Sequence, residues 1–238
     1  MNGELDQIRE RYLRRDRLGR DPLVYSLLRP DQYMPQQEKE RVYLSILSRL
    51  DPSAIKTMMV LEIGCGGGAN ILQFLRWGFL PENIKGNELL ADRCAQARHI
   101  LPAAVEIIEG DACSLHLPDR SFDIVMASTV LTSVLDKSFR VRLAQKMWSL
   151  VKPGGAVLWY DFVYNNPANA DVTAIPRRQV LELFPEARAF TRKVTLAPPI
   201  ARLVSRCHPG LYSLFNFFPF LRTHLVAWLV KPGSPDLG

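Results

Sequence analysis

The sequence has few residues of the kinds that bind metals or form disulfide bonds, since four of its 238 residues are cysteine and four are histidine. The cysteines form no C-x-x-C pair, and no histidines stand at zinc-binding spacing beside them. No carboxylate and histidine cluster suggests a metal ion either. No secretory signal peptide precedes the cysteines, so we expect a reduced, cytoplasmic protein without a metal. The cysteines are Cys65, Cys94, Cys113 and Cys207.

Acidic residues are scarce in the C-terminal segment. The formal net charge of the chain is +6, and the segment from residue 187 onward carries seven basic residues against one acid, Asp236. The basic residues are Arg188, Arg192, Lys193, Arg202, Arg206, Arg222 and Lys231. Such an imbalance can attract phosphate groups, anionic lipid or nucleic acid, or it can belong to an ordinary soluble surface. The composition leaves these alternatives open.

One apolar run, residues 211–230, has the length of a membrane span. Its polar residues and its proline are Asn216, Pro219, Arg222 and His224. Charged groups near the centre of a span are costly, so we predict instead a helical insertion over residues 199–220 and a strand over residues 223–230. Phenylalanines beside arginines also suit a membrane interface, and peripheral contact with the inner membrane face therefore stays an open alternative.

A glycine-rich turn dominates what is present. Residues 59–70 read Met-Val-Leu-Glu-Ile-Gly-Cys-Gly-Gly-Gly-Ala-Asn, an apolar strand followed by a turn and the start of a helix. Glycine has no Cβ, so a ligand can touch the backbone of such a turn. The spacing Gly64-x-Gly66-x-x-Ala69 would also satisfy the relaxed dinucleotide fingerprint. A carboxylate at Glu62 would repel a pyrophosphate, however, and suits a ligand with an ammonium and a sulfonium group.

Two further strands are predicted to end in acids. Residues 84–90 place Glu88 at the end of a second strand, where adenosine-binding folds put an acid for the ribose hydroxyls. Residues 105–112 form a third strand that ends in Gly-Asp-Ala and contains Asp111. The carboxyl ends of parallel strands meet at one edge of a sheet, so we expect both acids near the glycine turn.

The order and spacing of these motifs resemble the class I S-adenosylmethionine-dependent methyltransferases. Their first motif, acid-x-Gly-x-Gly-x-Gly, stands here from Glu62 to Gly68. Residues 121–128 are similar to the fourth strand of that family, and residues 150–160 to its Leu-x-Pro-Gly-Gly turn and fifth strand. The resemblance implies S-adenosyl-L-methionine as cofactor, with Asp111 beside the adenine amino group.

The resemblance also implies the fold and the cofactor residues. We expect an α/β, Rossmann-like seven-stranded methyltransferase sheet with helices on both faces, an N-terminal helical lid and a helical insertion before the last strand. The expected units are a lid over residues 1–50, a cofactor-binding core over 51–198, and a cap with the final edge strand over 199–238. The expected cofactor residues are Glu62, Gly64, Cys65, Gly66, Glu88, Leu89, Asp111, Ala112 and Ser128.

The N-terminal segment predicts two helices. Residues 1–20 alternate acids, arginines and apolar residues, which indicates an amphipathic helix, and we interpret it as largely solvated. Residues 36–50 predict a second helix, with Pro35 in its first turn. In the family such helices often lie over the cofactor pocket and close it with an aromatic side chain. Tyr12, Tyr25 and Tyr33 are the candidates, although we favour packing roles for them.

The middle of the chain alternates strands and helices. We predict helices over residues 70–77, 91–99 and 137–151, a parallel sheet with right-handed crossovers, a helix starting at residues 176–178, and a sixth strand over residues 188–196. The insertion at residues 199–220 is expected to cap the acceptor pocket.

Catalysis by methyl transfer requires mainly alignment and exclusion of water. Many members of the family carry a histidine pair after the fourth strand, where this chain has Thr132 and Ser133. The remaining candidate base is Asp161, at the end of the fifth strand, and the alternative is a structural acid that accepts hydrogen bonds from loop amides.

The acceptor is predicted only as a class. The layout after the fifth strand resembles bacterial methyltransferases of surface polysaccharide or secondary metabolite synthesis, which favours O-methylation of a glycan or lipid-linked sugar hydroxyl. A quinone, another lipid or a natural product is the alternative. We do not expect a nucleic acid as acceptor, because the Asn/Asp-Pro-Pro-Tyr/Phe motif of base methylases is absent at residues 128–131. The sequence predicts no oligomeric state.

Overall fold

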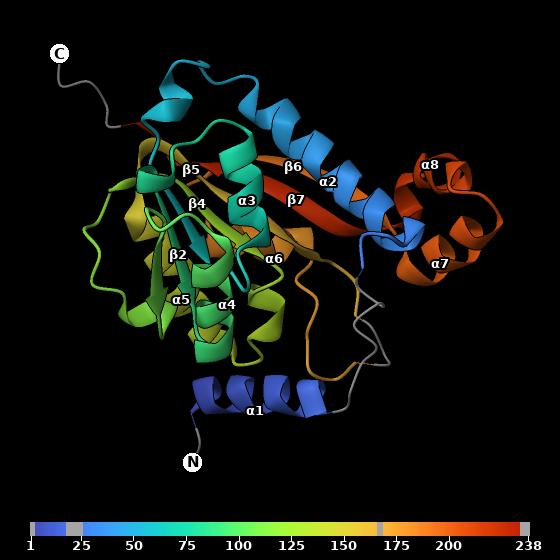
Figure 1. Ribbon diagram of the computed structural model, residues 1–238, viewed down its shortest axis with the longest axis horizontal. Helices are drawn as coiled ribbons and strands as arrows, with labels where there is room; N and C mark the ends of the chain where they lie inside the picture. Colours follow the sequence, from blue (N-terminus) through green and yellow to red (C-terminus); the bar gives the residue numbers. More distant parts are fainter. Residues whose placement is uncertain (1–2, 18–25, 166–168, 234–238) are drawn as a thin grey trace.

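The computed structural model describes residues 3–17, 26–165 and 169–233. Its centre is a seven-stranded sheet of order β3-β2-β1-β4-β5-β7-β6, in which β7 runs antiparallel to both of its neighbours (Figure 1). The strands are β1 (Val60–Ile63), β2 (Ile84–Glu88), β3 (Glu106–Glu109), β4 (Phe122–Ser128), β5 (Val151–Phe162), β6 (Arg188–Leu196) and β7 (Arg222–Val230). This confirms the predicted methyltransferase-type sheet.

Helices cover both faces of the sheet. They are α1 (Glu4–Arg17), α2 (Pro30–Leu47), α3 (Ala69–Arg76), α4 (Ala91–Ile100), α5 (Lys137–Leu150), α6 (Arg177–Leu183), α7 (Pro198–Cys207) and α8 (Gly210–Asn216). On one face, side chains of α2, α3 and α4 pack against Val60, Ile124 and Leu158. On the other, α5 and α6 pack against Leu61 and Val125. All four residues of β1 are buried, as expected for a parallel strand covered on both faces.

The N-terminal helices differ from the prediction. Helix α2 begins at Pro30, whose fixed φ suits a first helical position, and continues through Pro35 to Leu47. Pro35 is therefore an interior residue that lacks an N–H, so the carbonyl of Asp31 loses its usual helical donor. Periodicity alone missed the first turn of α2 because Pro35 looked like a start signal.

The C-terminal elements follow the predicted order. Strand β6 leads into α7, α8 and a short 3-10 helix η6 (Pro219–Leu221), and β7 returns along β5 and β6. Leu196, Ala201, Val204 and Tyr212 form a small cluster of their own, against which Met34 of α2 packs. Within the described residues, no helix is long and apolar enough to cross a membrane.

Candidate active site

A cavity of about 520 Å³ lies at the carboxyl ends of β1, β2 and β4. This size is within the range of small-molecule sites. Of the residues predicted to hold a cofactor, Gly64, Cys65, Gly66, Glu88, Leu89, Asp111, Ala112 and Ser128 line this cavity. Glu62 does not line it and is fully buried behind the turn. The structure therefore brings the sequence motifs together around one cavity.

The turn between β1 and α3 requires its glycines. Gly64, Gly66 and Gly68 have φ values of +66°, +54° and +88°, a region that residues with a Cβ rarely adopt. A Cβ at Gly64 would lie 2.6 Å from Cγ2 of Val130, whereas a Cβ at Gly66 would meet nothing within 4 Å. The backbone of Gly66 is thus open to a ligand, while Gly64 packs against the segment that follows β4.

Glu88 stabilises this turn through hydrogen bonds to backbone amides. Its Oε2 accepts a hydrogen bond from the amide of Gly66 at 2.8 Å, and its Oε1 accepts from the amides of Leu89 at 2.8 Å and Leu90 at 3.0 Å. The side chain is buried yet borders the cavity. A carboxylate is thereby fixed at the end of β2, in the wall of the cavity.

Asp111 stands at the corresponding end of β3. Its carboxylate accepts hydrogen bonds from the amide of Cys113 and the hydroxyl of Ser114, each at 2.9 Å. Asp111 thus caps the 3-10 helix η4 (Ala112–Ser114), which fixes Ala112 in the cavity wall.

A buried charged group that the sequence did not indicate is Lys39 of α2. It lines the cavity, and its Nζ donates to Oδ1 of Asn70 at 3.3 Å. Nδ2 of Asn70 donates in turn to Oε1 of Glu62 at 2.6 Å. Oε2 of Glu62 has no hydrogen-bond partner among the described residues.

Burial shifts the pKa values of both Lys39 and Glu62. It lowers the pKa of Lys39 to about 8, although the nearby Glu62 opposes that change. Burial likewise raises the pKa of Glu62 to about 8, against the hydrogen bond from Asn70 and the charge of Lys39. The carboxyl group of Glu62 behind the glycine turn is therefore joined through Asn70 to the amine of Lys39 in the cavity wall. The residues around Lys39 in the sequence do not predict this position, because Lys39 reaches the cavity only through the packing of α2 on the sheet.

Helix α1 lies across the cavity and supplies part of its wall through Leu5, Ile8 and Tyr12. The ring of Tyr12 lies between two guanidinium groups, with Arg93 at 4.4 Å and Arg15 at 4.8 Å from its centroid. The interpretation of α1 as a solvated helix is therefore wrong. Of the other tyrosine candidates, Tyr33 is not part of the cavity wall, and Tyr25 lies outside the described residues.

Hydrogen bonds attach α1 to the segment between β4 and α5. Oε1 of Glu4 accepts from the amide of Leu135 at 2.8 Å and from Arg11 at 2.9 Å, and Arg11 also donates to the carbonyl of Ser133 at 3.0 Å. Arg14 forms an ion pair with Asp171. The helix is therefore held from two sides as a cover over the cavity.

Asp161, the candidate base, does not reach the cavity. Its side chain is fully buried, and it accepts hydrogen bonds from the hydroxyl of Thr132 at 2.5 Å, the amide of Thr132 at 3.1 Å and the amide of Phe162 at 3.1 Å. Burial raises the pKa of Asp161 to about 7, and these hydrogen bonds oppose the rise. The structure thus brings Asp161 to Thr132, on the segment that forms the cavity wall, rather than to the cavity itself.

Part of the cavity wall is apolar, and it is called the apolar end below. Its side chains come from α1, the segment after β4 and α5, and they are Leu5, Ile8, Val134, Phe139 and Leu143. Among the described lining residues none is histidine, and the carboxylates Glu88 and Asp111 lie with Lys39 on the side of the glycine turn, called the polar end below. The other ionisable side chains of the wall are Tyr12, Cys65 and Arg93.

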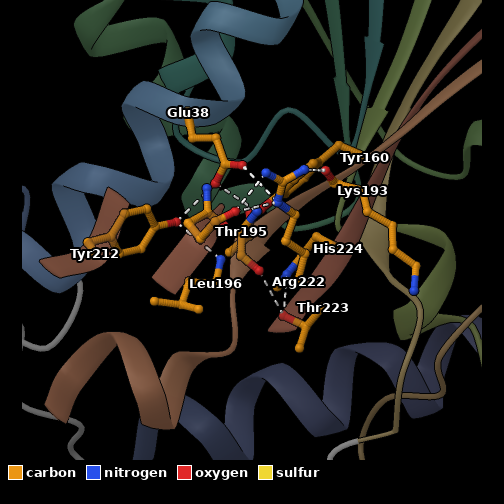
Figure 2. A network of polar contacts seen from close by, with 10 residues as sticks. Glu38, Tyr160, Lys193, Thr195, Leu196, Tyr212, Arg222, Thr223 and His224 are labelled. Atoms are coloured by element: carbon orange, nitrogen blue, oxygen red, sulfur yellow. Dashed lines mark hydrogen bonds and ion pairs between the residues drawn. The ribbon is translucent and has the colours of Figure 1, made fainter. Parts of the chain in front are cut away.

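The helical insertion does not cap this cavity, contrary to our expectation. None of the described residues 199–220 lines it. The apolar side of α7 and α8 packs instead on Met34 of α2 and on Leu196 at the end of β6. The polar contacts that hold the insertion there involve Glu38 of α2, Thr195 and Tyr212 (Figure 2).

Comparison with known proteins agrees with this geometry. A family model described as a methyltransferase domain matches residues 60–155. The chain is 32% identical over 123 residues to a fatty-acid O-methyltransferase of Mycolicibacterium smegmatis, covering 51% of this chain and 42% of that protein. It is 28% identical over 176 residues to a phthiotriol/phenolphthiotriol dimycocerosates methyltransferase of Mycobacterium tuberculosis, covering 68% of this chain and 63% of that protein. The chain thus spans less than two thirds of the length of either relative.

The fold recurs in solved structures. A SAM-dependent methyltransferase from Archaeoglobus fulgidus superimposes with a TM-score of 0.58 at 16% identity, over 81% of this chain and 94% of that one. The likeness concerns the fold, and the sequence motifs around the cavity identify the cofactor class. Residues 60–155 therefore match a methyltransferase domain, and the chain as a whole has the fold of the class I S-adenosylmethionine-dependent methyltransferases.

Proposed function

We propose that this protein transfers a methyl group from S-adenosylmethionine to an oxygen atom of a lipid-like acceptor. The observation that carries the proposal is the apolar end of the cavity, bounded by residues such as Ile8, Val134 and Phe139. A sugar, which the sequence favoured, needs hydrogen-bond partners for several hydroxyls, and these side chains offer none. The two relatives named for fatty-acid and dimycocerosate substrates support an apolar acceptor.

The polar end fits the cofactor of the family. The open backbone at Gly66 and the carboxylate of Glu88 suit an adenosine, and Asp111 with Ala112 borders the place of its base. Lys39 lines the cavity, is joined to Glu62 through Asn70, and suits the carboxylate of an amino acid. When bound, S-adenosylmethionine supplies a methyl group on a positively charged sulfur.

The chain itself contributes alignment and exclusion of water. Helix α1 covers the cavity, and the 129–134 segment, held by Asp161 through Thr132, forms its wall. No imidazole borders the described cavity, and its apolar end has no carboxylate. An acceptor that is already ionised, such as a fatty-acid carboxylate, has no proton to lose and so needs no base. We therefore propose a carboxylate as the acceptor group.

Product analysis tests this function. The purified chain is incubated with S-adenosylmethionine labelled in its methyl group and, separately, with a long-chain fatty acid, a long-chain alcohol and a nucleotide-linked sugar. We expect a labelled methyl ester from the fatty acid and little product from the other two. A Glu88→Gln variant with unchanged melting temperature should lose this activity. Label in the sugar with none in the fatty acid would show that the acceptor is wrong.

A further inference from the structure

Helix α8 and η6 expose an apolar surface away from the cavity. The exposed fractions are 59% for Leu214, 37% for Phe215, 76% for Phe217, 43% for Phe218 and 73% for Phe220. These five residues are named the phenylalanine face below. The rings of Phe217 and Phe218 lie 5.8 Å apart and those of Phe218 and Phe220 lie 5.7 Å apart, so these three rings form one patch. Soluble proteins rarely leave such a cluster in water without a partner for it.

This exposure is built into the fold, because the opposite side of α8 is fixed. Tyr212 is buried, and its hydroxyl donates to Oε2 of Glu38 at 3.0 Å and accepts from the amide of Leu196 at 3.2 Å. Glu38 also accepts from the amide of Thr195 at 2.8 Å. Figure 2 shows these groups converging between α2 and the ends of β6 and β7.

Arg222 secures the other end of α8. Its guanidinium donates to the carbonyl of Asn216 at 2.8 Å and 2.6 Å, and to the carbonyl of Lys193 at 3.1 Å. A rigid support of this kind presents the phenylalanine face in one orientation, so little conformational entropy is lost when a partner covers it.

The positive charge near the phenylalanine face favours a negatively charged partner. The described chain contains no aspartate or glutamate from Arg188 to its last described residue, 233. Helix α7 packs beside α8 (Figure 1), and its Arg202 and Arg206 are exposed. A two-fold contact with a second copy of the chain would bring this basic region against itself, which is repulsive. A negatively charged surface that also accepts aromatic side chains is the complementary partner, and an anionic lipid bilayer has both properties.

We infer that α7, α8 and η6 dock this protein on the surface of an anionic lipid membrane. The phenylalanine face enters the boundary between headgroups and acyl chains, and Arg202 and Arg206 contact lipid phosphates. The inference rests on the proposed function only for the reason why the protein would dock, since a lipid-like acceptor would reside in that membrane. Docking itself requires neither acceptor nor cofactor.

Vesicle sedimentation tests the docking surface. The full chain is mixed with vesicles of phosphatidylcholine alone or of phosphatidylcholine with phosphatidylglycerol, without S-adenosylmethionine, and the bound fraction is measured. We expect binding to the anionic vesicles and at least about tenfold weaker partitioning for Phe217→Ser/Phe220→Ser. Arg202→Gln/Arg206→Gln should also weaken binding to anionic vesicles, by about tenfold at low salt.

Matched controls separate this surface from general effects. Leu72→Ser/Val141→Ser changes two exposed apolar residues on α3 and α5, and Arg41→Gln/Arg178→Gln removes the same charge elsewhere. Both controls should bind vesicles like the wild type. Absence of wild-type binding, or equal loss in the controls, would overturn the inference. So would a dimer that Phe217→Ser/Phe220→Ser dissociates while vesicles are not bound. Because no methyl transfer is measured, these outcomes are independent of the proposed acceptor.

Discussion

Asp161 carries a carboxylate with no exposed surface, and three hydrogen bonds from Thr132 and Phe162 engage its oxygens. A general base must come within hydrogen-bond reach of the proton it removes, and Asp161 borders no part of the cavity. Thr132, which it holds, belongs to the segment that forms the cavity wall. We therefore propose that Asp161 is a positioning residue that fixes this segment.

The titration of Asp161 gives a first prediction. Its folded pKa of about 7 is above the value of about 3.9 expected when unfolded, so the folded protein keeps a proton that the unfolded chain releases. This contribution to stability is present in acid and is lost as the pH rises through 7. Asp161→Asn should lower Tm by about 2–8 °C at pH 5 and by less at pH 8, with kcat reduced less than about tenfold.

The comparison variant for Asp161→Asn is Asp119→Asn, at an exposed position. Thermal melting from pH 4 to pH 9 and steady-state kinetics over the same range give both readouts. A base would behave differently: kcat of Asp161→Asn would fall about a thousandfold with Tm unchanged, and the acid limb of the pH profile would disappear.

At the level of single residues, local spacing predicted the polar end of the cavity. Gly66, Glu88 and Asp111 lie at the carboxyl end of a strand or within three residues of it, and parallel strands bring such positions to one edge. Lys39 could not be found in this way. It lies in a helix more than twenty residues before the glycine turn, and its role depends on how α2 packs on the sheet.

Among the helices, α1 was predicted from the sequence, but its packing over the cavity was not. Its many arginines and acids predicted a solvated helix, yet Ile8 and Arg11 are both buried. The partners of Arg11 are the carboxylate of Glu4 and the carbonyl of Ser133, so its charge is satisfied against the core. Sequence periodicity carries no information about such a distant carbonyl.

The cover formed by α1 yields a second prediction. Tyr12→Ala removes an aromatic ring that lines the cavity between Arg93 and Arg15, and should weaken S-adenosylmethionine binding by about 5–30-fold. Leu13→Ala, which alters the neighbouring exposed residue of the same helix, should leave binding unchanged. Calorimetric titration of both variants measures the effect. Equal affinities for wild type and Tyr12→Ala would mean that α1 does not contact the cofactor.

For the molecule as a whole, hydrophobic patterns and turn residues predicted the sheet, including β6 at residues 188–196 and the final strand within one residue of its observed start. The position of the insertion was not predictable. Its packing depends on Met34 and Glu38 of α2, which are far from it in sequence and carry no signal for that contact. The two helices that we expected to cover the acceptor, α7 and α8, therefore pack beside α2 instead.

We expect the apolar end of the cavity to hold the acyl chain of an acceptor. The most direct test measures kcat/KM for saturated fatty acids of increasing length, with S-adenosylmethionine in excess. We expect kcat/KM to rise by up to about fourfold for each added methylene until the cavity is filled, because each group leaves water for apolar surroundings. Val134→Asp should abolish the rise. A kcat/KM that is independent of chain length, or highest for short polar acids, would contradict the account.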